Sequence, residues 1–287
     1  MPLTINTNIQ SLNAQRNLNN SQASLSTSMQ RLSSGLRINS AKDDAAGSAI
    51  AERMGAQVRG MNVAIRNAND GISLAQTAEG ALGKVADSLQ RMRELAVQSA
   101  NASNSDDDKD SLDEEFGQLA QEIQRVLGGT RFNGQEILGT DAGAQEFKIG
   151  ANTTTNDAIT VTTTNMTTDA NITAVAGTDN AGTGRAVIDN TANAAAINTV
   201  IDNIDTALDT VNSERATFGA TQSRFDAVIS NLQVSVENQS AARARIMDAD
   251  FASETANLSR AQILQQAGNA MIAQANQLPQ QVLSLLR

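Results

Sequence analysis

The fold is decided by residues 250–287, which read DFASETANLSRAQILQQAGNAMIAQANQLPQQVLSLLR. Apolar residues recur there at steps of three and four, which average about 3.5 residues, the spacing of a coiled-coil seam. The residues of this predicted seam are Leu264, Ala267, Met271, Ala275, Leu278, Val282 and Leu285. Further apolar residues lie off the seam, including Leu258, Ile263 and Ile272, so the apolar surface is wider than one partner helix requires.

The beginning of the chain offers a matching helix. Leu18, Leu25 and Leu32 are seven residues apart, and Met29 and Leu36 extend the pattern toward a predicted helix end near Gly35. Both chain ends carry few charges, so they can be buried against each other or against other copies of the chain. We therefore expect the two ends to form one terminal coiled coil, and we assign the Leu, Met and Val positions of the two predicted seams to subunit packing.

Composition excludes several classes of function. The 287 residues include no Cys, His, Trp or Tyr and six Phe. Without thiolates and imidazoles the chain lacks the usual zinc ligands and the usual proton shuttle at neutral pH, so we predict no enzyme, no metal site and no cofactor. The net charge of −10 opposes binding to nucleic acid, and no apolar run long enough for a membrane helix or a conventional signal peptide is present.

Long helices fill the first half of the chain. The only prolines are Pro2 and Pro279, so no proline interrupts the residues between them. A second helix is predicted to start at a capping box formed by Ser40 and Asp43 and to run to about residue 100. Ser105, followed by three Asp residues, predicts the start of a third helix, which we expect to end in a left-handed cap at residues 128–129, both Gly.

The second half begins with β structure. Asn133-Gly134 favours a tight turn, and residues 147–149 and 158–162 have the β-branched content of short strands. Residues 163–184 are rich in Thr, Asn and Gly and are predicted to form an exposed loop. From 197 to 236 helical periodicity returns, with Arg215 and Gln222 as the polar residues on the seam; they either set the register between helices or mark a level open to solvent.

These elements predict a mainly α fold. It consists of a long-helix rod, an antiparallel helical bundle with small β-hairpins, and a terminal coiled-coil domain formed by both chain ends. The expected domains are residues 1–45 with 248–287 for the coiled coil, residues 46–162 with 185–247 for the rod, and residues 163–184 for the exposed loop.

Several stretches resemble bacterial flagellin, the subunit of the flagellar filament. They are LSSGLRINSAKDDAAG at 32–47, RNANDGIS at 66–73, LQRMRELAVQS at 89–99, FNG at 132–134 and QQVLSLLR at 280–287. The resemblance covers roughly the first 150 and last 100 residues, and the outer variable domains of longer flagellins are absent. It implies an inner helical domain made from both termini, which is disordered in the free monomer and becomes ordered when subunits polymerise.

The resemblance also implies a location and a set of partners. The chain would be exported unfolded by the flagellar type III system, without a cleaved signal peptide, and would polymerise outside the cell into the filament used for swimming. Other copies of the chain, cap and hook-associated proteins and an export chaperone are the implied partners. A hook–filament junction protein and a soluble coiled-coil adaptor are the alternatives.

Two innate immune receptors are implied as further partners. The vertebrate Toll-like flagellin receptor would contact Arg91, Leu95 and Glu115. The plant flagellin receptor would recognise the stretch from Gln30 to Ala51.

Overall fold

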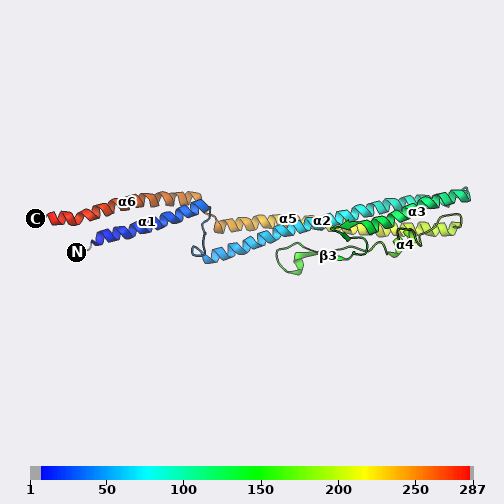
Figure 1. Ribbon diagram of the computed structural model, residues 1–287, viewed down its shortest axis with the longest axis horizontal. Coiled ribbons are helices and arrows are strands. Elements are labelled where there is room, and N and C mark those ends of the chain that lie inside the picture. Colours follow the sequence, from blue (N-terminus) through cyan, green and yellow to red (C-terminus); the bar gives the residue numbers. More distant parts are fainter. Residues whose placement is uncertain (1–7, 285–287) are drawn as a thin grey trace. The chain divides into compact units, whose positions relative to one another are not determined.

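The structure is a computed structural model that describes residues 8–284, with side chains for residues 8–277 (Figure 1). The chain divides into two compact units. Unit 1 contains residues 1–56 and 237–287, and unit 2 contains residues 57–236. The predicted fold class is confirmed, because long helices make up most of the chain and the strands among residues 8–284 form only two small antiparallel pairs.

The elements follow one another in this order: α1 (Ile9–Ser34), α2 (Ala45–Ser99), α3 (Asp106–Gly129), β1 (Arg131–Phe132), β2 (Gln135–Glu136), β3 (Ala144–Lys148), the 3-10 helix η1 (Thr155–Asp157), β4 (Ala158–Thr162), α4 (Ala170–Ala176), α5 (Ala194–Met247) and α6 (Phe251–Ser284).

Polar caps define both ends of α1. The Asn8 side chain accepts a hydrogen bond from the Ser11 backbone N–H at the start of the helix. At the other end Gly35 adopts the left-handed conformation, with φ of 71°, and donates its N–H to the Arg31 carbonyl. Glycine adopts this conformation without the steric cost that a Cβ would bring, so the predicted end of the first helix is confirmed.

The start of α2 differs from the sequence prediction. Ser40 and Asp43 do hydrogen-bond to each other, but they close a turn that lies before the helix. The carboxylate of Asp44 instead accepts the Gly47 N–H at 2.9 Å, and the helix begins at Ala45. A capping carboxylate one residue farther along therefore satisfies one of the free N–H groups of the first turn.

One end of α3 was predicted correctly and the other was not. Ser105 and Asp108 form the capping box at its start. The predicted left-handed cap at residues 128–129 is wrong, because the helix includes Gly129 and ends at Thr130 in an extended conformation, with φ of −75° and ψ of 112°. The chain enters strand β1 directly at Arg131, so it needs an extended exit from the helix.

Two hairpins follow α3 in unit 2. Strands β1 and β2 are joined by Asn133 and Gly134, whose φ angles of 49° and 84° give the predicted tight turn. Strands β3 and β4 pair antiparallel, from Ala144 opposite Thr162 to Lys148 opposite Ala158. Strand β3 starts three residues before the predicted stretch and ends before Ile149.

Residues 163–177 do not form the exposed loop that their composition predicts, whereas residues 178–184 are largely exposed as expected. Thr163 and Met166 are buried, and the next residues form α4, whose apolar Ile172 and Val175 are fully buried in the core of unit 2. The prediction was wrong because it counted polar residues and overlooked that a few apolar ones, at helical spacing, are enough to anchor a short segment.

The core of unit 2 lies between α2, α3 and α5. Phe116, Phe218 and Phe225 are its largest buried side chains. Phe225 lies so close to α2 that a Cβ on Gly71 would be 2.6 Å from its ring, and the same ring packs edge-on against Phe147. These contacts join α2, α5 and strand β3 in one core.

The structure decides between the two interpretations of Gln222. Its side-chain amide donates a 2.8 Å hydrogen bond to the Glu79 carboxylate on α2, in a half-buried position. Because this bond forms at only one alignment of the two helices, it favours the role in helix register. Arg215 is likewise half-buried.

The domain boundaries remain a prediction. The division into units falls inside α2 and α5, whereas the predicted boundaries after residue 45 and before residue 248 fall at helix ends. The terms inner domain and outer domain also refer to positions within an assembled filament.

Candidate assembly surface

In unit 1, helices α1 and α6 pack against each other along heptad seams (Figure 1). The least exposed positions of α1 alternate in steps of three and four: Ser11, Ala14, Leu18, Ser21, Leu25, Ser28 and Leu32. The least exposed positions of α6 do the same: Glu254, Leu258, Ala261, Gln265, Gly268, Ile272 and Ala275. This periodicity is typical of two helices that pack as a coiled coil.

Small residues let the two helices approach closely. Ala261, Gly268 and Ala275 are seven residues apart on α6, as the three leucines are on α1. A Cβ on Gly268 would lie 3.2 Å from the Leu18 Cδ1 atom, which is tighter than ordinary contact. The large side chains of α1 therefore fill the space that the small side chains of α6 leave open.

Polar contacts at both ends of the seam fix its direction. Near one end the Arg31 guanidinium lies 3.0 Å from the Glu254 carboxylate, which is 7% exposed. Near the other end the Asn8 side chain donates to the Ala275 carbonyl at 2.7 Å. The start of α1 thus lies beside the later part of α6, so the two helices are antiparallel.

The environment of Glu254 favours its charged form. Burial acts to raise the pKa of this carboxyl, but the hydrogen bonds from Arg31 and Ser28 and the positive charge of Arg31 outweigh burial and lower the pKa below its ordinary value. Glu254 therefore stays ionised at neutral pH and pairs with the guanidinium.

The two connectors of unit 1 are joined by backbone contacts. Leu36 forms an isolated antiparallel bridge with Asp248, and Ala249 donates its N–H to the Gly35 carbonyl at 2.9 Å. The Arg37 side chain donates to the Ile246 carbonyl. Leu36 therefore lies beyond the end of α1 and is not on its seam, contrary to the sequence prediction.

Most of the described residues predicted for the seam of α6 are also not the ones that face α1. Leu264 and Met271 are 50% and 61% exposed, and Met29 of α1 is 56% exposed. The sequence pattern favoured large apolar residues, whereas the helices meet through Ala and Gly. Leu18, Leu25 and Leu32 are half-buried. The side chains of Leu278 and Val282, and the whole of Leu285, lie outside the described residues.

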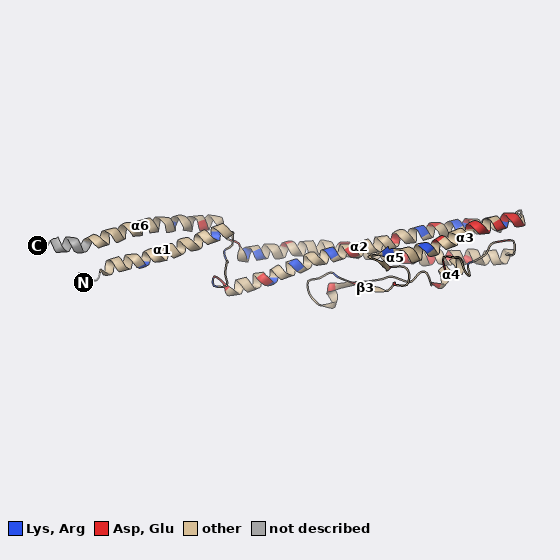
Figure 2. Cartoon of the chain, in the orientation of Figure 1, with Lys and Arg blue, Asp and Glu red and all other residues tan. Residues whose placement is uncertain are grey.

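An outward apolar flank results, made of Ile263, Leu264, Ala267 and Met271 on α6. Among the described residues, large exposed apolar side chains gather in unit 1: Ile9, Leu12, Met29, Ile50, Phe251, Ile263, Leu264 and Met271, against Val63, Val97, Val187 and Val234 in unit 2. Figure 2 shows that most of α6 is uncharged. An apolar surface of this kind is typical of a site that another protein surface covers.

A second surface in unit 2 contains two of the residues assigned to receptor contact. Arg91 on α2 donates to Glu115 on α3 and to Glu94, each at 2.9 Å; the side chains of Arg91 and Glu115 are about half exposed, and that of Glu94 is 67% exposed. The hydrogen bond that Arg91 donates to Glu115, followed by the one it donates to Glu94, raises the pKa of Arg91. Leu95, in contrast, has no exposed surface, so it supports the helix packing beneath this patch and is not available for contact.

No helix in the described part of the chain is both long enough and apolar enough to cross a membrane. Among the same residues, no group of three or more Asp or Glu side chains is placed to hold a metal ion. Long helices and an exposed apolar flank define a structural protein whose chain associates with other chains.

Comparison with known proteins identifies which one. The family model for the bacterial flagellin N-terminal helical region matches residues 5–142, and the model for the C-terminal helical region matches residues 201–286. A flagellin of Halalkalibacterium halodurans is 45% identical over 285 residues, covering 99% of this chain and 100% of the relative. A flagellin of Xenorhabdus nematophila is 45% identical over 315 residues, with both chains fully covered. The chain belongs to the bacterial flagellin family.

Family membership gives the protein its function. It is a structural subunit of the flagellar filament, it polymerises with copies of itself outside the cell, and it is not an enzyme. Flagellin A of Vibrio anguillarum, 36% identical, aligns over 382 residues with both chains fully covered. Since that exceeds the 287 residues of this chain, the relative contains residues that have no counterpart here.

The hook–filament junction alternative is not favoured. A solved structure of a putative flagellar hook-associated protein from Vibrio parahaemolyticus has a TM-score of 0.60, covering 72% of this chain and 100% of that chain. Its sequence identity of 14% shows a shared fold alone. The sequence matches, in contrast, are to flagellins along nearly the whole chain.

Proposed function

We propose that the outward apolar flank of unit 1 is the surface by which this subunit packs against its neighbours in the filament. The observation that carries the proposal is that Met271 is 61% exposed, although another face of its helix, α6, already packs against α1. Covering such a side chain removes apolar surface from water and stabilises the assembly at each repeated contact. Leu278, Val282 and Leu285 continue the same spacing toward the chain end.

The direct experiment compares two Asp substitutions on α6. Met271→Asp places a charge in the apolar flank, so it should abolish seeded polymerisation, because an unpaired charge is costly to bury. Asn269→Asp, at an exposed position of the same helix outside the apolar flank, adds the same charge and is the matched control. Electron microscopy of seeded samples gives the filament yield, and circular dichroism shows whether both monomers keep their helices. Equal yields from both variants would refute the proposal.

Export and further partners also belong to the proposal. We expect the chain to leave the cell unfolded through the flagellar type III system, assisted by an export chaperone, and to meet cap and hook-associated proteins during assembly. Export without a cleaved signal peptide predicts that the intact mass of the secreted protein includes the first residues of the sequence. A mature protein shortened by a leader-sized segment would contradict this route.

The surface around Arg91 is our candidate for contact with the vertebrate Toll-like flagellin receptor. Arg91 and Glu115 are exposed and form an ion pair, which offers a receptor both charges on adjacent helices. Arg91→Ala should lower receptor activation in a reporter-cell assay, whereas Lys84→Ala, which breaks an exposed ion pair on the same helix, should not. Equal activation by the two variants would exclude this surface. The plant receptor's stretch, residues 30–51, includes the end of α1 and the start of α2.

A further inference from the structure

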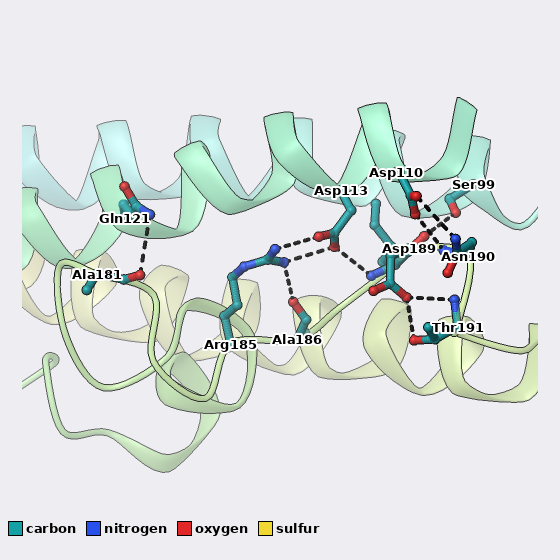
Figure 3. A network of polar contacts seen from close by, with 11 residues as sticks. Ser99, Asp110, Asp113, Gln121, Ala181, Arg185, Ala186, Asp189, Asn190 and Thr191 are labelled. Atoms are coloured by element: carbon teal, nitrogen blue, oxygen red, sulfur yellow. Dashed lines mark hydrogen bonds and ion pairs between the residues drawn. The ribbon is translucent and has the colours of Figure 1, made fainter. Parts of the chain in front are cut away.

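The segment between α4 and α5, residues 177–193, runs alongside α3 as an ordered strap (Figure 3). Its first part is tied to α3 by the side chains of Gln121 and Gln124, which donate to the carbonyls of Ala181 and Gly177. Near its end the backbone N–H of Asn190 donates to the Asp110 carboxylate at 3.1 Å. The strap is thus held by helix side chains along its length.

The strongest contacts lie at the middle of the strap. The Arg185 guanidinium forms a two-pronged ion pair with Asp113 of α3, and one of its nitrogens also donates to the Ala186 carbonyl (Figure 3). Asp113 is 8% exposed, and its Oδ1 atom also accepts the backbone N–H of Ile188 at 2.9 Å. Paired hydrogen bonds between a guanidinium and a carboxylate are stronger and more directional than a simple charge contact.

A second helix joins the same point. The Ser99 hydroxyl, at the end of α2, donates to the Ile188 carbonyl at 2.6 Å. Both backbone polar groups of Ile188 are therefore bonded to helix side chains, and the Ile188 side chain is fully buried. The middle of the strap thus connects α2 and α3 shortly before the chain enters α5.

The sequence of α3 makes room for the guanidinium. A Cβ added at Gly117 would lie 3.2 Å from three atoms of the Arg185 guanidinium group, so any larger residue would press on it. Glycine within a helix is less favourable than alanine, because it loses more conformational freedom on folding. A glycine at this position is thus explained by the close approach of Arg185.

We infer that Arg185 and Asp113 form a latch that holds the strap closed over α2 and α3 and keeps Ile188 in the core. Opening the latch releases the strap while the long helices remain paired, because Phe218 and Phe225 hold α5 through contacts outside the strap. Removal of one partner leaves the other charge partly buried and unpaired, which is far less favourable than the intact pair. The latch lies in unit 2 and is independent of the proposed assembly surface in unit 1.

Hydrogen–deuterium exchange on the full chain tests the latch. In Arg185→Ala the backbone amides of Ile188 and Asn190 should exchange at least about tenfold faster, whereas those of α2 and α5 keep their protection. Thermolysin, which cuts before Val and Ile, should cleave at Val187 or Ile188 faster by a similar factor. Lys84→Ala removes an ion pair whose side chains are 77% and 70% exposed and should change neither rate.

A glycine pair provides a second test that keeps both charges. Gly117→Ala should speed exchange of the strap amides, because the added methyl group displaces the guanidinium. Gly219→Ala on α5, where nothing lies within 4 Å of the new Cβ, should leave strap exchange unchanged. Filament assembly should persist in all four variants, so its loss alone would bear on the assembly proposal and not on the latch.

Two results would overturn the inference. The first is unchanged strap exchange and cleavage in both Arg185→Ala and Gly117→Ala. The second is equal loss of protection in the strap, α2 and α5, because the ion pair would then be one part of a single cooperative core and would not act as a separate latch.

Discussion

At the scale of single residues, glycines mark where the elements of this flagellin come closest. Gly71 belongs to the stretch RNANDGIS by which the chain resembles its family, and the structure gives that glycine a physical role: a Cβ there would lie 2.6 Å from the Phe225 ring. The sequence identified this stretch without indicating what it packs against, because the partner lies on a helix far along the chain.

We predict opposite effects for two alanine substitutions on α2. Gly71→Ala should destabilise unit 2 by about 1–3 kcal/mol, because the buried Phe225 ring has to move. Gly83→Ala, with nothing within 4 Å of the new Cβ, should stabilise the same helix by about 1 kcal/mol. Urea unfolding followed by circular dichroism measures both changes. Equal stabilities would show that the close contact at Gly71 is not limiting.

At the scale of elements, the antiparallel pairing of α1 with α6 depends on small residues and one ion pair. The sequence predicted both helices and their pairing, since leucines seven residues apart give a clear periodic signal. It did not predict which face of α6 meets α1. The large apolar side chains of Leu264 and Met271 led to the predicted seam, but the residues that pack against α1 are the small Ala261, Gly268 and Ala275. A sequence pattern that weights side chains by size cannot detect such a seam.

The same limit applies to the strap and α4. Residues 163–184 contain few large apolar residues, so composition favoured an exposed loop. Their order comes from long-range partners such as Gln124, whose side chain donates to the Gly177 carbonyl 53 residues later. Local sequence does not reveal a contact that depends on where another helix passes. Capping signals such as Ser105 with Asp108, in contrast, are local and were predicted correctly.

The ion pair between α1 and α6 predicts a dependence on pH. Because the pKa of Glu254 is lower in the folded pair than in the unfolded chain, its contribution to stability is complete above the unfolded pKa and is lost as the pH falls through the folded pKa. The stability difference between the wild type and Glu254→Gln should therefore shrink on acidification. Thermal melts of the monomer at a series of pH values measure it. A constant difference across the acidic range would count against the assigned role of Glu254.

At the scale of the whole molecule, unit 1 packs α1 against α6 along their seam. It nevertheless contains most of the large apolar side chains that are exposed among the described residues. Unit 2 buries its large side chains in one core shared by three long helices. Most of these exposed apolar side chains lie on the terminal helices α1 and α6, where a second copy can cover them.

Because the sequence contains no cysteine, a single introduced thiol can report whether the outward apolar flank is covered in the filament. A single thiol introduced by Met271→Cys, at a position that is 61% exposed, can be labelled with a maleimide in the monomer and in filaments. Labelling should slow at least about tenfold when the subunits polymerise, because neighbouring copies cover the outward apolar flank of α6. Equal labelling rates in monomer and filament would contradict this prediction.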